Sequence, residues 1–350
     1  MHDAEKTSKR KLDHLALFAS DETRSRERST LFECVHLDHD ALPELCLDDI
    51  DMKAEIAGYS LKAPFMITGM TGGAEEAGRI NRICARIAQD LGIAMGVGSQ
   101  RAMIEDDSLT STYQVRDIAP DIFLAGNIGG VQATQYSTDT VREALKRIEA
   151  SALCIHLNPA QELAQPEGDR DFRGVLDAIR RIADELDVPV IVKETGAGIG
   201  SSAVARLLKT GVSIMDVSGL GGTSWVGAEI LRGKNADPAM EQFWDWGIPT
   251  APAVLYAARQ GATVIASGGI RNGIDAAKAF SLGASLCGIA APVIRALMNG
   301  DEEDATRTMN DFIKGLKSAM LLTGCDSVTK LRTAPKTVTE PLASWIRRKK

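Results

Sequence analysis

Four polar residues that could do chemistry lie within one short segment, HLNPAQE at residues 156–162. His156 offers a titratable ring, Asn158 and Gln161 offer amide groups, and Glu162 offers a carboxylate. Proteins usually bind Mg²⁺ through one carboxylate together with substrate phosphates, so Glu162 is a candidate Mg²⁺ ligand rather than part of a zinc site. The alternative is that Glu162 is a solvated loop carboxylate.

A lysine at the end of an apolar run indicates an anion nearby. Lys193 ends the run VPVIVK at residues 188–193. Burying its ammonium group without a partner would be costly. A reduced flavin, which carries negative charge, is one candidate partner. An ion pair with Glu194 or Asp216 is the alternative.

The N-terminal segment carries a basic cluster made of Lys9, Arg10, Lys11 and His14. Arginine forks and lysine point charges both suit phosphate oxygens, so this cluster is a candidate clamp for a diphosphate. Charge runs near chain termini are usually solvated, which is the alternative here.

The composition is that of a soluble globular protein. Of 350 residues, 44% are hydrophobic and 25% are charged, which suits one large domain or two ordinary ones. The net charge of −7 argues against binding nucleic acid or an anionic membrane through the overall field. No apolar stretch reaches the roughly 20 residues that span a bilayer, and the polar N-terminus lacks a signal-peptide core. We therefore expect a cytoplasmic protein whose scattered cysteines stay reduced.

Short apolar runs return at intervals of roughly 30 residues, the length of one strand plus one crossover helix. Most of them lack polar alternation, which is typical of strands buried on both faces of a parallel sheet. The eight runs are PFMIT (64–68), IAMGV (93–97), IFLAG (122–126), ALCIHL (152–157), VPVIVK (188–193), VSIMDV (212–217), TVIAS (263–267) and LCGIA (286–290).

Amphipathic stretches between these runs predict helices, so the chain is expected to be an α/β protein. Eight strand–helix units favour a closed (β/α)8 TIM barrel over an open sheet. We expect residues 61–350 to form this barrel and residues 1–60 to form an extension packed on it. Trp244 and Trp246 are expected to anchor the long connection after the sixth strand.

Polar or glycine-rich turns follow nearly every predicted strand and would meet at one mouth of the barrel. Barrels commonly bind phosphate at the turns after strands seven and eight, through backbone N–H groups and a helix N-terminus. The residues expected to hold a phosphate there are Gly268, Gly269, Arg271, Ala290 and Ala291.

Several motifs together resemble those of a known family, the type 2, FMN-dependent isopentenyl diphosphate isomerases, over almost the whole chain. They are RKLDH (10–14), MTGG (70–73), GSQR (98–101), GN (126–127), HLNPAQE (156–162), VKETGAGI (192–199), GGTSW (221–225) and SGGIRNG (267–273).

The resemblance implies a cofactor site and a substrate site. The residues expected to contact FMN are Thr68, Gly69, Met70, Ser99, Asn127, Lys193, Thr223, Gly268, Gly269, Arg271, Ala290 and Ala291. Those expected to hold the prenyl diphosphate are Arg10, Lys11, His14, Ser99, Arg101, His156, Asn158 and Gln161. Glu162 would bind Mg²⁺, NADPH would reduce the flavin, and the chain would assemble as a homotetramer or homo-octamer.

The implied reaction moves a double bond by one carbon, because one proton is added to an allylic system and another is removed. An unactivated alkene is a poor base, so the reaction needs a well-positioned acid, and the electron-rich reduced flavin meets this need. We hypothesise that flavin N5 exchanges the proton. Gln161, His156 and Glu229 would support or relay it, with Lys193 as a further candidate beside the flavin.

Three other functions are weighed against this one. An FMN-dependent 2-hydroxy-acid oxidase would share the barrel but needs a histidine base near its end, and no histidine follows His156. A nucleotide dehydrogenase of the inosine monophosphate type needs a cysteine nucleophile in a mouth loop, which Cys287 and Cys325 do not provide. A non-catalytic flavin-binding protein would not need so many polar groups at the strand ends.

Overall fold

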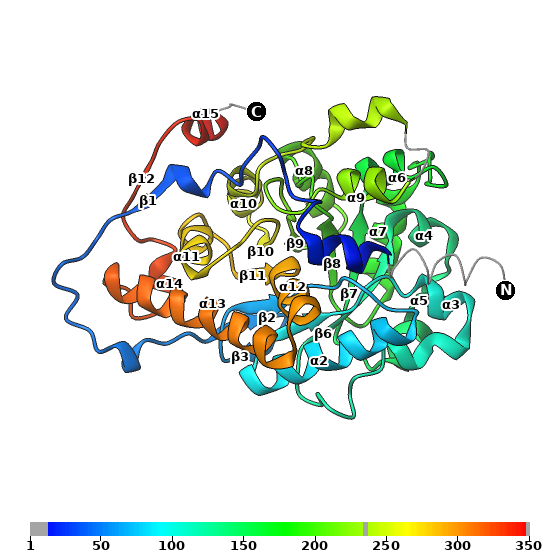
Figure 1. Cartoon of the computed structure of the whole chain (residues 1–350), viewed down its shortest axis with the longest axis horizontal. Helices are drawn as coiled ribbons and strands as arrows, with labels where there is room; N and C mark the ends of the chain where they lie inside the picture. The colour runs from blue at the N-terminus through cyan, green and yellow to red at the C-terminus, as the bar shows by residue number, and fades with distance from the viewer. Residues whose placement is uncertain (1–12, 234–236, 348–350) are drawn as a thin grey trace.

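The computed structural model describes residues 13–233 and 237–347, and its centre is a closed barrel of eight parallel strands (Figure 1). The strands are β4 (Phe65–Ile67), β5 (Ala94–Gly96), β6 (Leu124–Gly129), β7 (Ala152–Leu157), β8 (Val190–Glu194), β9 (Ile214–Asp216), β10 (Thr263–Ala266) and β11 (Leu286–Ile289). Each strand pairs with the next one in sequence, and β11 closes the barrel by pairing with β4. Each predicted run coincides with one strand, although β6 and β8 continue beyond their runs to Gly129 and Glu194. The predicted (β/α)8 barrel is therefore confirmed.

Helices connect the strands and surround the barrel (Figure 1). The outer helices are α2 (Glu75–Leu91), α5 (Thr138–Arg147), α7 (Val175–Glu185), α8 (Ser201–Leu208), α10 (Thr250–Ala258), α11 (Gly273–Ser281) and α13 (Glu302–Leu322). Helices that follow strand ends more directly are α3 (Arg101–Glu105), α4 (Gly130–Gln135), α6 (Pro159–Ala164), α9 (Trp225–Arg232) and α12 (Ala291–Asn299). Local sequence sets several bounds: Ser137 accepts the Thr140 N–H at 3.1 Å to cap α5, and Gly92 ends α2 at a φ of 63°.

A hairpin closes the N-terminal end of the barrel. It is formed by β2 (Ala54–Ile56) and β3 (Tyr59–Leu61), which pair antiparallel. Its buried Ile56 and Leu61 belong to the same core cluster as residues at the starts of the barrel strands. The C-terminal strand ends are therefore the open end, where barrel enzymes carry their active sites. The domain boundary that we predicted at residue 60 falls inside β3, just before the first barrel strand.

The first described part of the extension crosses the open end of the barrel. Residues 13–20 form a helix that lies over this end in Figure 1. The chain then pairs with the turn after β9, where Ser25 N–H donates to Gly222 O at 2.9 Å and Ser224 N–H donates to Thr23 O at 2.7 Å. Beyond this point, β1 (Val35–Leu37) pairs antiparallel with β12 (Lys336–Val338), close to α14 (Val328–Leu331) and α15 (Leu342–Arg347).

The two tryptophans in the long connection after β9 behave differently. Trp244 is buried, donates its Nε1–H to Arg24 O at 3.0 Å, and carries the Arg26 guanidinium 3.4 Å above its ring. It therefore anchors the connection to the extension as predicted. Trp246 is 62% exposed and contacts Phe243 on the surface, so the prediction that it is an anchor is wrong.

Two further sequence predictions concern the whole chain. No helix among the described residues is long and apolar enough to cross a membrane. The six cysteines are free thiols, and five of them are buried while Cys46 is exposed.

Candidate active site

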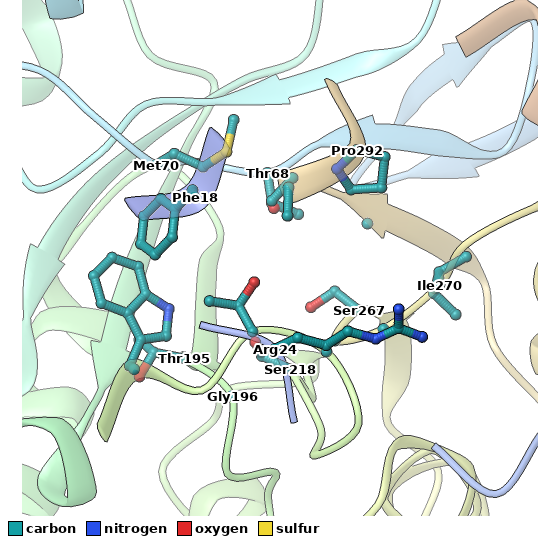
Figure 2. Close-up of a pocket in the computed structure, with 18 of the residues that line it drawn as sticks. Phe18, Arg24, Thr68, Met70, Thr195, Gly196, Ser218, Ser267, Ile270 and Pro292 are labelled. Carbon is teal, nitrogen blue, oxygen red and sulfur yellow. The ribbon is translucent and has the colours of Figure 1, made fainter. Parts of the chain in front are cut away.

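A cavity opens at the C-terminal ends of the strands and has a volume of about 800 Å³ with its mouth included (Figure 2). Strand-end turns form most of its walls, and the extension contributes Phe18 and Arg24. Eight predicted flavin residues line it: Thr68, Met70, Thr223, Gly268, Gly269, Arg271, Ala290 and Ala291. Five of the eight predicted turns, those after β4, β8, β9, β10 and β11, therefore meet at this cavity.

The turn after β10 requires glycine at two successive positions. Gly268 and Gly269 have φ angles of +90° and +77°, which other residues rarely adopt. A Cβ on Gly268 would lie 2.2 Å from the carbonyl oxygen of Gly219, and one on Gly269 would lie 2.7 Å from that of Gly221. Backbone therefore packs directly on backbone, and main-chain atoms are exposed to the cavity, as close binding of a phosphate requires.

Positive charge gathers at the same end of the cavity, where Arg24, Arg271 and Arg295 contribute to the wall. Burial lowers the pKa of Arg271, and the charges of Arg24 and Arg295 lower it further against the pull of Asp21. Asp21 forms ion pairs with both Arg24 and Arg295. Nε of Arg295 is nevertheless buried without a hydrogen-bond partner among the described residues. Crowded guanidinium groups with an unsatisfied donor favour a bound anion.

The first turn of α12 adds backbone donors to this end. Its N-cap residue, Ala290, has no side chain that can cap the helix, and Ala290, Ala291 and Pro292 line the cavity. A helix N-terminus carries partial positive charge and free N–H groups. These donors, the glycine turn and the arginines fit the phosphate of FMN, while Met70 and Trp225 offer apolar surface for a flat ring.

Four predicted flavin residues do not line this cavity: Gly69, Ser99, Asn127 and Lys193. Gly69 has a packing role, because a Cβ there would lie 2.0 Å from the carbonyl oxygen of Val97 after β5. The sequence pattern alone did not separate this packing role from contact with a cofactor.

Lys193 forms the ion pair that was the alternative to a flavin contact. Its Nζ lies 3.9 Å from Oδ2 of the buried Asp216 and donates to Glu194 O at 2.6 Å. Burial raises the pKa of Asp216, while Lys193 and the Ser267 hydroxyl, which donates to Oδ1, oppose this shift. Ser267 also lines the cavity, so the pair lies directly behind the cavity wall.

Glu194 organises the turn after β8. Its Oε2 accepts backbone N–H groups from four successive residues, at 2.6 Å from Thr195, 2.7 Å from Gly196 and 3.2 Å from Gly198, with Ala197 donating as well. Thr195 and Gly196 form part of the cavity wall. One buried carboxylate therefore fixes the shape of this wall.

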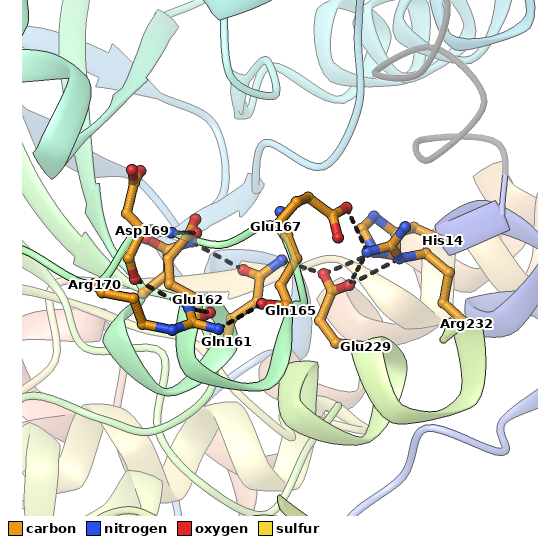
Figure 3. Close-up of polar contacts among 10 residues, drawn as sticks. His14, Gln161, Glu162, Gln165, Glu167, Asp169, Arg170, Glu229 and Arg232 are labelled. Carbon is orange, nitrogen blue, oxygen red and sulfur yellow. Dashed lines mark hydrogen bonds and ion pairs between the residues drawn. The ribbon is translucent and has the colours of Figure 1, made fainter. Parts of the chain in front are cut away.

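Glu229 on α9 is the centre of a polar network that links the extension to α6 (Figure 3). Its side chain is fully buried. Oε1 receives hydrogen bonds from His14 Nε2 at 3.1 Å and from Gln161 Nε2 at 2.9 Å, and Oε2 receives one from Arg232 Nε at 2.8 Å. Burial acts to raise the pKa of Glu229, but His14, Gln161 and Arg232 outweigh it and hold the pKa at about 2. Glu229 is therefore an anion at any neutral pH.

The network continues from Gln161 through the polar segment that the sequence singled out. Asn158 Nδ2 donates to Gln161 Oε1 at 3.2 Å and to Glu162 Oε1 at 2.9 Å. Oε2 of Glu162 accepts the Asp169 N–H at 2.8 Å. Three of the four candidates thus lie in one hydrogen-bonded row that has a carboxylate at each end, Glu162 and Glu229.

His156 lies beside this row, at the end of β7. Its Nδ1 is 2.8 Å from Oδ1 of Asn127. An amide oxygen only accepts, so Nδ1 carries the proton in this contact. Asn127 is itself held by Gln100, whose Oε1 accepts the Asn127 N–H at 2.9 Å. The predicted flavin residue Asn127 therefore orients the His156 ring.

The remaining predicted substrate residues do not line the cavity or lie outside the described residues. Arg101 donates Nε–H to Glu105 at 2.7 Å, and its N–H lies 3.4 Å from Ser99 Oγ. Arg10 and Lys11 lie outside the described residues. His14 is the first described residue of the basic cluster to reach the site.

Curated relatives match nearly the whole chain. The isopentenyl-diphosphate delta-isomerase of Methanosarcina mazei is 44% identical over 95% of this chain and 92% of its own length. The enzyme of Aeropyrum pernix with the same name is 47% identical over 94% of this chain and 89% of its own length. The one of Pyrococcus abyssi is 45% identical over 90% of this chain and 88% of its own length. The chain belongs to the isopentenyl-diphosphate delta-isomerase family. The resemblance seen in the motifs is thereby confirmed.

The cofactor-binding half of this isomerase-family chain also matches a wider group. The family model of FMN-dependent dehydrogenases matches residues 132–338, which include the glycine turn and α12. Solved structures of mandelate oxidase variants share the fold, with TM-scores of 0.64 and 0.65 at 20% identity over 89% and 97% of this chain and 90% and 98% of theirs. This chain therefore shares its fold with the oxidases. The histidine base that the oxidase alternative requires after β7 is absent from the sequence.

Several residues of the isomerase-family site were not predicted from the sequence. Arg24 and Arg295 reach the cavity from the extension and from α12, and no local pattern marks them. Asp216 and Glu194 were weighed only as partners of Lys193. A charged residue within or directly after an apolar run was a usable signal for both of them, as it was for Lys193.

Proposed function

We propose that this protein converts isopentenyl diphosphate to dimethylallyl diphosphate, with FMN held in the cavity at the C-terminal strand ends. The family supports this reaction. The observation that carries the proposal is that a phosphate-suited end, formed by Gly268, Gly269 and Arg271, shares one barrel mouth with the polar network around Glu229. In this proposal the cofactor would lie beside the residues that support proton movement.

The chain's own residues would bind the substrate and place polar groups around the reacting carbons. When bound, reduced FMN supplies an electron-rich ring that can support acid–base chemistry at an alkene. Gln161 is held between Glu229 and Asn158, and His156 is held by Asn127. These rigid groups would orient the substrate and support movement of a proton.

We expected from the sequence that Glu229 supports or relays a proton, but in this proposal it does not relay one. Its pKa of about 2 keeps it ionised at neutral pH. It would therefore act as a fixed acceptor that orients Gln161 and His14, rather than as a group that takes up and releases a proton in each turnover.

Mg²⁺ at Glu162 is the proposed partner of the substrate diphosphate. No cluster of three or more His, Cys, Asp or Glu residues that could hold a metal occurs in the part of the chain that the structure describes. A site made of one carboxylate, water and diphosphate oxygens is compatible with this finding, and it is the arrangement that Mg²⁺ commonly adopts with phosphates. The row through Asn158 fixes the Glu162 carboxylate in place.

Reduction by NADPH, assembly as a homotetramer or homo-octamer and a cytoplasmic location are further parts of the proposal. They are supported by the family resemblance and by the composition. Arg10 and Lys11 are proposed to clamp the diphosphate, since they closely precede His14 in the sequence and His14 contacts Glu229.

An anaerobic assay tests the proposal. Purified protein would be incubated with FMN, NADPH, Mg²⁺ and isopentenyl diphosphate, and dimethylallyl diphosphate would be followed by NMR, with a parallel sample that lacks reductant. We expect product only when the flavin is reduced. Flavin binding and reduction without isomer, together with reduction of the bound flavin by a 2-hydroxy acid, would instead support an oxidase.

A further inference from the structure

Arg232 is a largely buried ion-pair partner of Glu229, and no sequence motif predicted it. It lies one helical turn after Glu229 on α9, and its side chain is only 15% exposed. Its Nε donates to Glu229 Oε2 at 2.8 Å, and its Nη2 pairs with Glu167 Oε1 at 2.8 Å in the loop after α6 (Figure 3). The arginine is thus held at both ends and covers the outer side of the Glu229 carboxylate.

Two basic groups face Glu229, but only one of them has a permanent charge. His14 approaches Oε1 from the extension, and an imidazole is charged only when it is protonated. The guanidinium of Arg232 is charged at every pH at which a protein folds. A fully buried carboxylate without a permanent counter-charge would be costly. Arg232 is therefore the neighbour whose charge favours the Glu229 anion even when His14 is neutral.

An anionic Glu229 decides the direction of the Gln161 amide. A carboxylate only accepts hydrogen bonds, so the Gln161 atom that faces it must be the NH2 group. The amide oxygen must then point the other way, where it accepts from Asn158 Nδ2 at 3.2 Å. A protonated Glu229 would be able to donate, and both directions of the amide would become possible.

We propose that Arg232 is a positioning residue for the reaction: its charge favours the Glu229 anion, so that Gln161 presents its NH2 group to Glu229 and its amide oxygen to Asn158. This inference rests on the proposed isomerase function. The charged groups around Glu229 are His14 from the extension and Arg232 from α9, with Glu167 behind Arg232.

The test compares Arg232→Met with Arg232→Lys. Methionine keeps much of the side-chain volume without charge, whereas lysine keeps the charge. We expect R232M to lower kcat by about 10- to 100-fold, the scale of misplaced catalytic groups, with KM changed less than about threefold. Lysine should restore at least a third of the lost kcat. Removing a positive charge also favours protonation of its neighbours, so the acid limb of kcat should move to higher pH in R232M by about one unit or more.

Matched controls separate positioning from general damage. Arg180→Met makes the same change at an exposed pair with Asp177, whose side chains are 48% and 81% exposed, and should leave kcat unchanged. Glu167→Gln removes only the half-exposed outer partner of Arg232 and should lower kcat less than about threefold, because such pairs contribute little. FMN affinity and the flavin spectrum should be the same in all variants.

A measurement without turnover distinguishes failure of this inference from failure of the proposed function. The ring signal of His14, assigned with a His14→Ala variant, follows protonation of the His14–Glu229 pair by NMR. Its midpoint should rise in R232M and return in R232K. An unchanged midpoint and unchanged kcat profile in R232M would overturn the inference, as would a loss of kcat accompanied by lost FMN binding. A wild-type protein that makes no dimethylallyl diphosphate would overturn the function, and the NMR midpoint would still decide whether Arg232 controls Glu229.

Discussion

At the scale of single residues, the phosphate end of the cavity depends on glycines that let two backbone segments touch. Gly268 faces Gly219 and Gly269 faces Gly221, and each would bring a Cβ into contact with a carbonyl oxygen. Their positive φ angles add a second constraint, because residues with a side chain are strained in the left-handed backbone conformation. Neither constraint depends on which ligand binds, so a substitution should damage the backbone and the cofactor site together.

Gly268→Ala and Gly261→Ala form a matched pair that separates strain from contact. Their φ angles of +90° and +86° give similar strain, but a Cβ on Gly261 meets nothing within 4 Å. We expect G261A to cost roughly 1–2 kcal/mol of stability. G268A should cost more and should weaken FMN binding at least about tenfold, or 1.4 kcal/mol. Flavin fluorescence titration and thermal unfolding measure both effects, and equal FMN affinities would contradict the proposed phosphate site.

At the scale of elements, a strand-end carboxylate shapes the turn that follows it. Glu194 ends β8 and gathers the N–H groups of residues 195–198 on one oxygen atom. Burial raises the pKa of Glu194 to about 7, although these N–H groups and Lys193 oppose the shift. The ordinary value of 4.5 applies when the chain is unfolded. The folded protein therefore binds an extra proton between these two pH values.

This difference predicts a pH dependence of stability. Because the folded state holds the proton more tightly, the contribution of Glu194 to stability falls as pH rises from about 4.5 to about 7, and it is constant above that. Glu194→Gln removes the titration, so its melting temperature should fall less than that of the wild type between pH 5 and pH 7. Scanning calorimetry at several pH values measures the difference. Parallel curves would show that Glu194 is already ionised throughout this window.

At the scale of the whole molecule, the extension and the barrel form one site. Asp245, in the connection after β9, accepts backbone N–H groups of Arg26 at 3.0 Å, Glu27 at 2.6 Å and Arg28 at 3.2 Å, and the Ser25 hydroxyl at 2.7 Å. These bonds fasten the segment that carries Arg24 into the cavity wall, directly after the helix that contains His14 and Phe18. A mouth loop therefore holds the extension in position.

Asp245→Asn should loosen this attachment, because an amide has one acceptor oxygen and turns an NH2 group toward backbone donors. Hydrogen bonds to a charged group contribute roughly 1.5–3 kcal/mol, so we expect KM for the substrate to rise about tenfold or more. Asp40→Asn is the control, since Asp40 accepts the Leu42 N–H at 2.9 Å in an exposed part of the extension. Steady-state kinetics measure both variants. A KM change of the same size in D40N would contradict the proposed role of Asp245.

Local patterns were sufficient to predict much of the fold and part of the site. Parallel strands buried on both faces appear as apolar runs without alternation, so all eight barrel strands could be found in order. The turn at Gly268 and Gly269 was marked by its place after the seventh run. Asn158, Gln161 and Glu162 are close in sequence, so one turn of α6 was enough to bring them into one row.

The sequence by itself thus determined the barrel, the glycine turn, the HLNPAQE segment and the family. Tertiary structure decided what these residues contact. His14 meets Glu229 across 215 residues, and Arg24 joins Arg295 at the phosphate end, because the extension folds back over the barrel mouth. Trp244 is buried because it packs against the extension, where it donates to Arg24 O. Trp246, two residues later, is exposed. Strand and turn signals arise from neighbours along the chain, whereas these contacts depend on how separate elements pack.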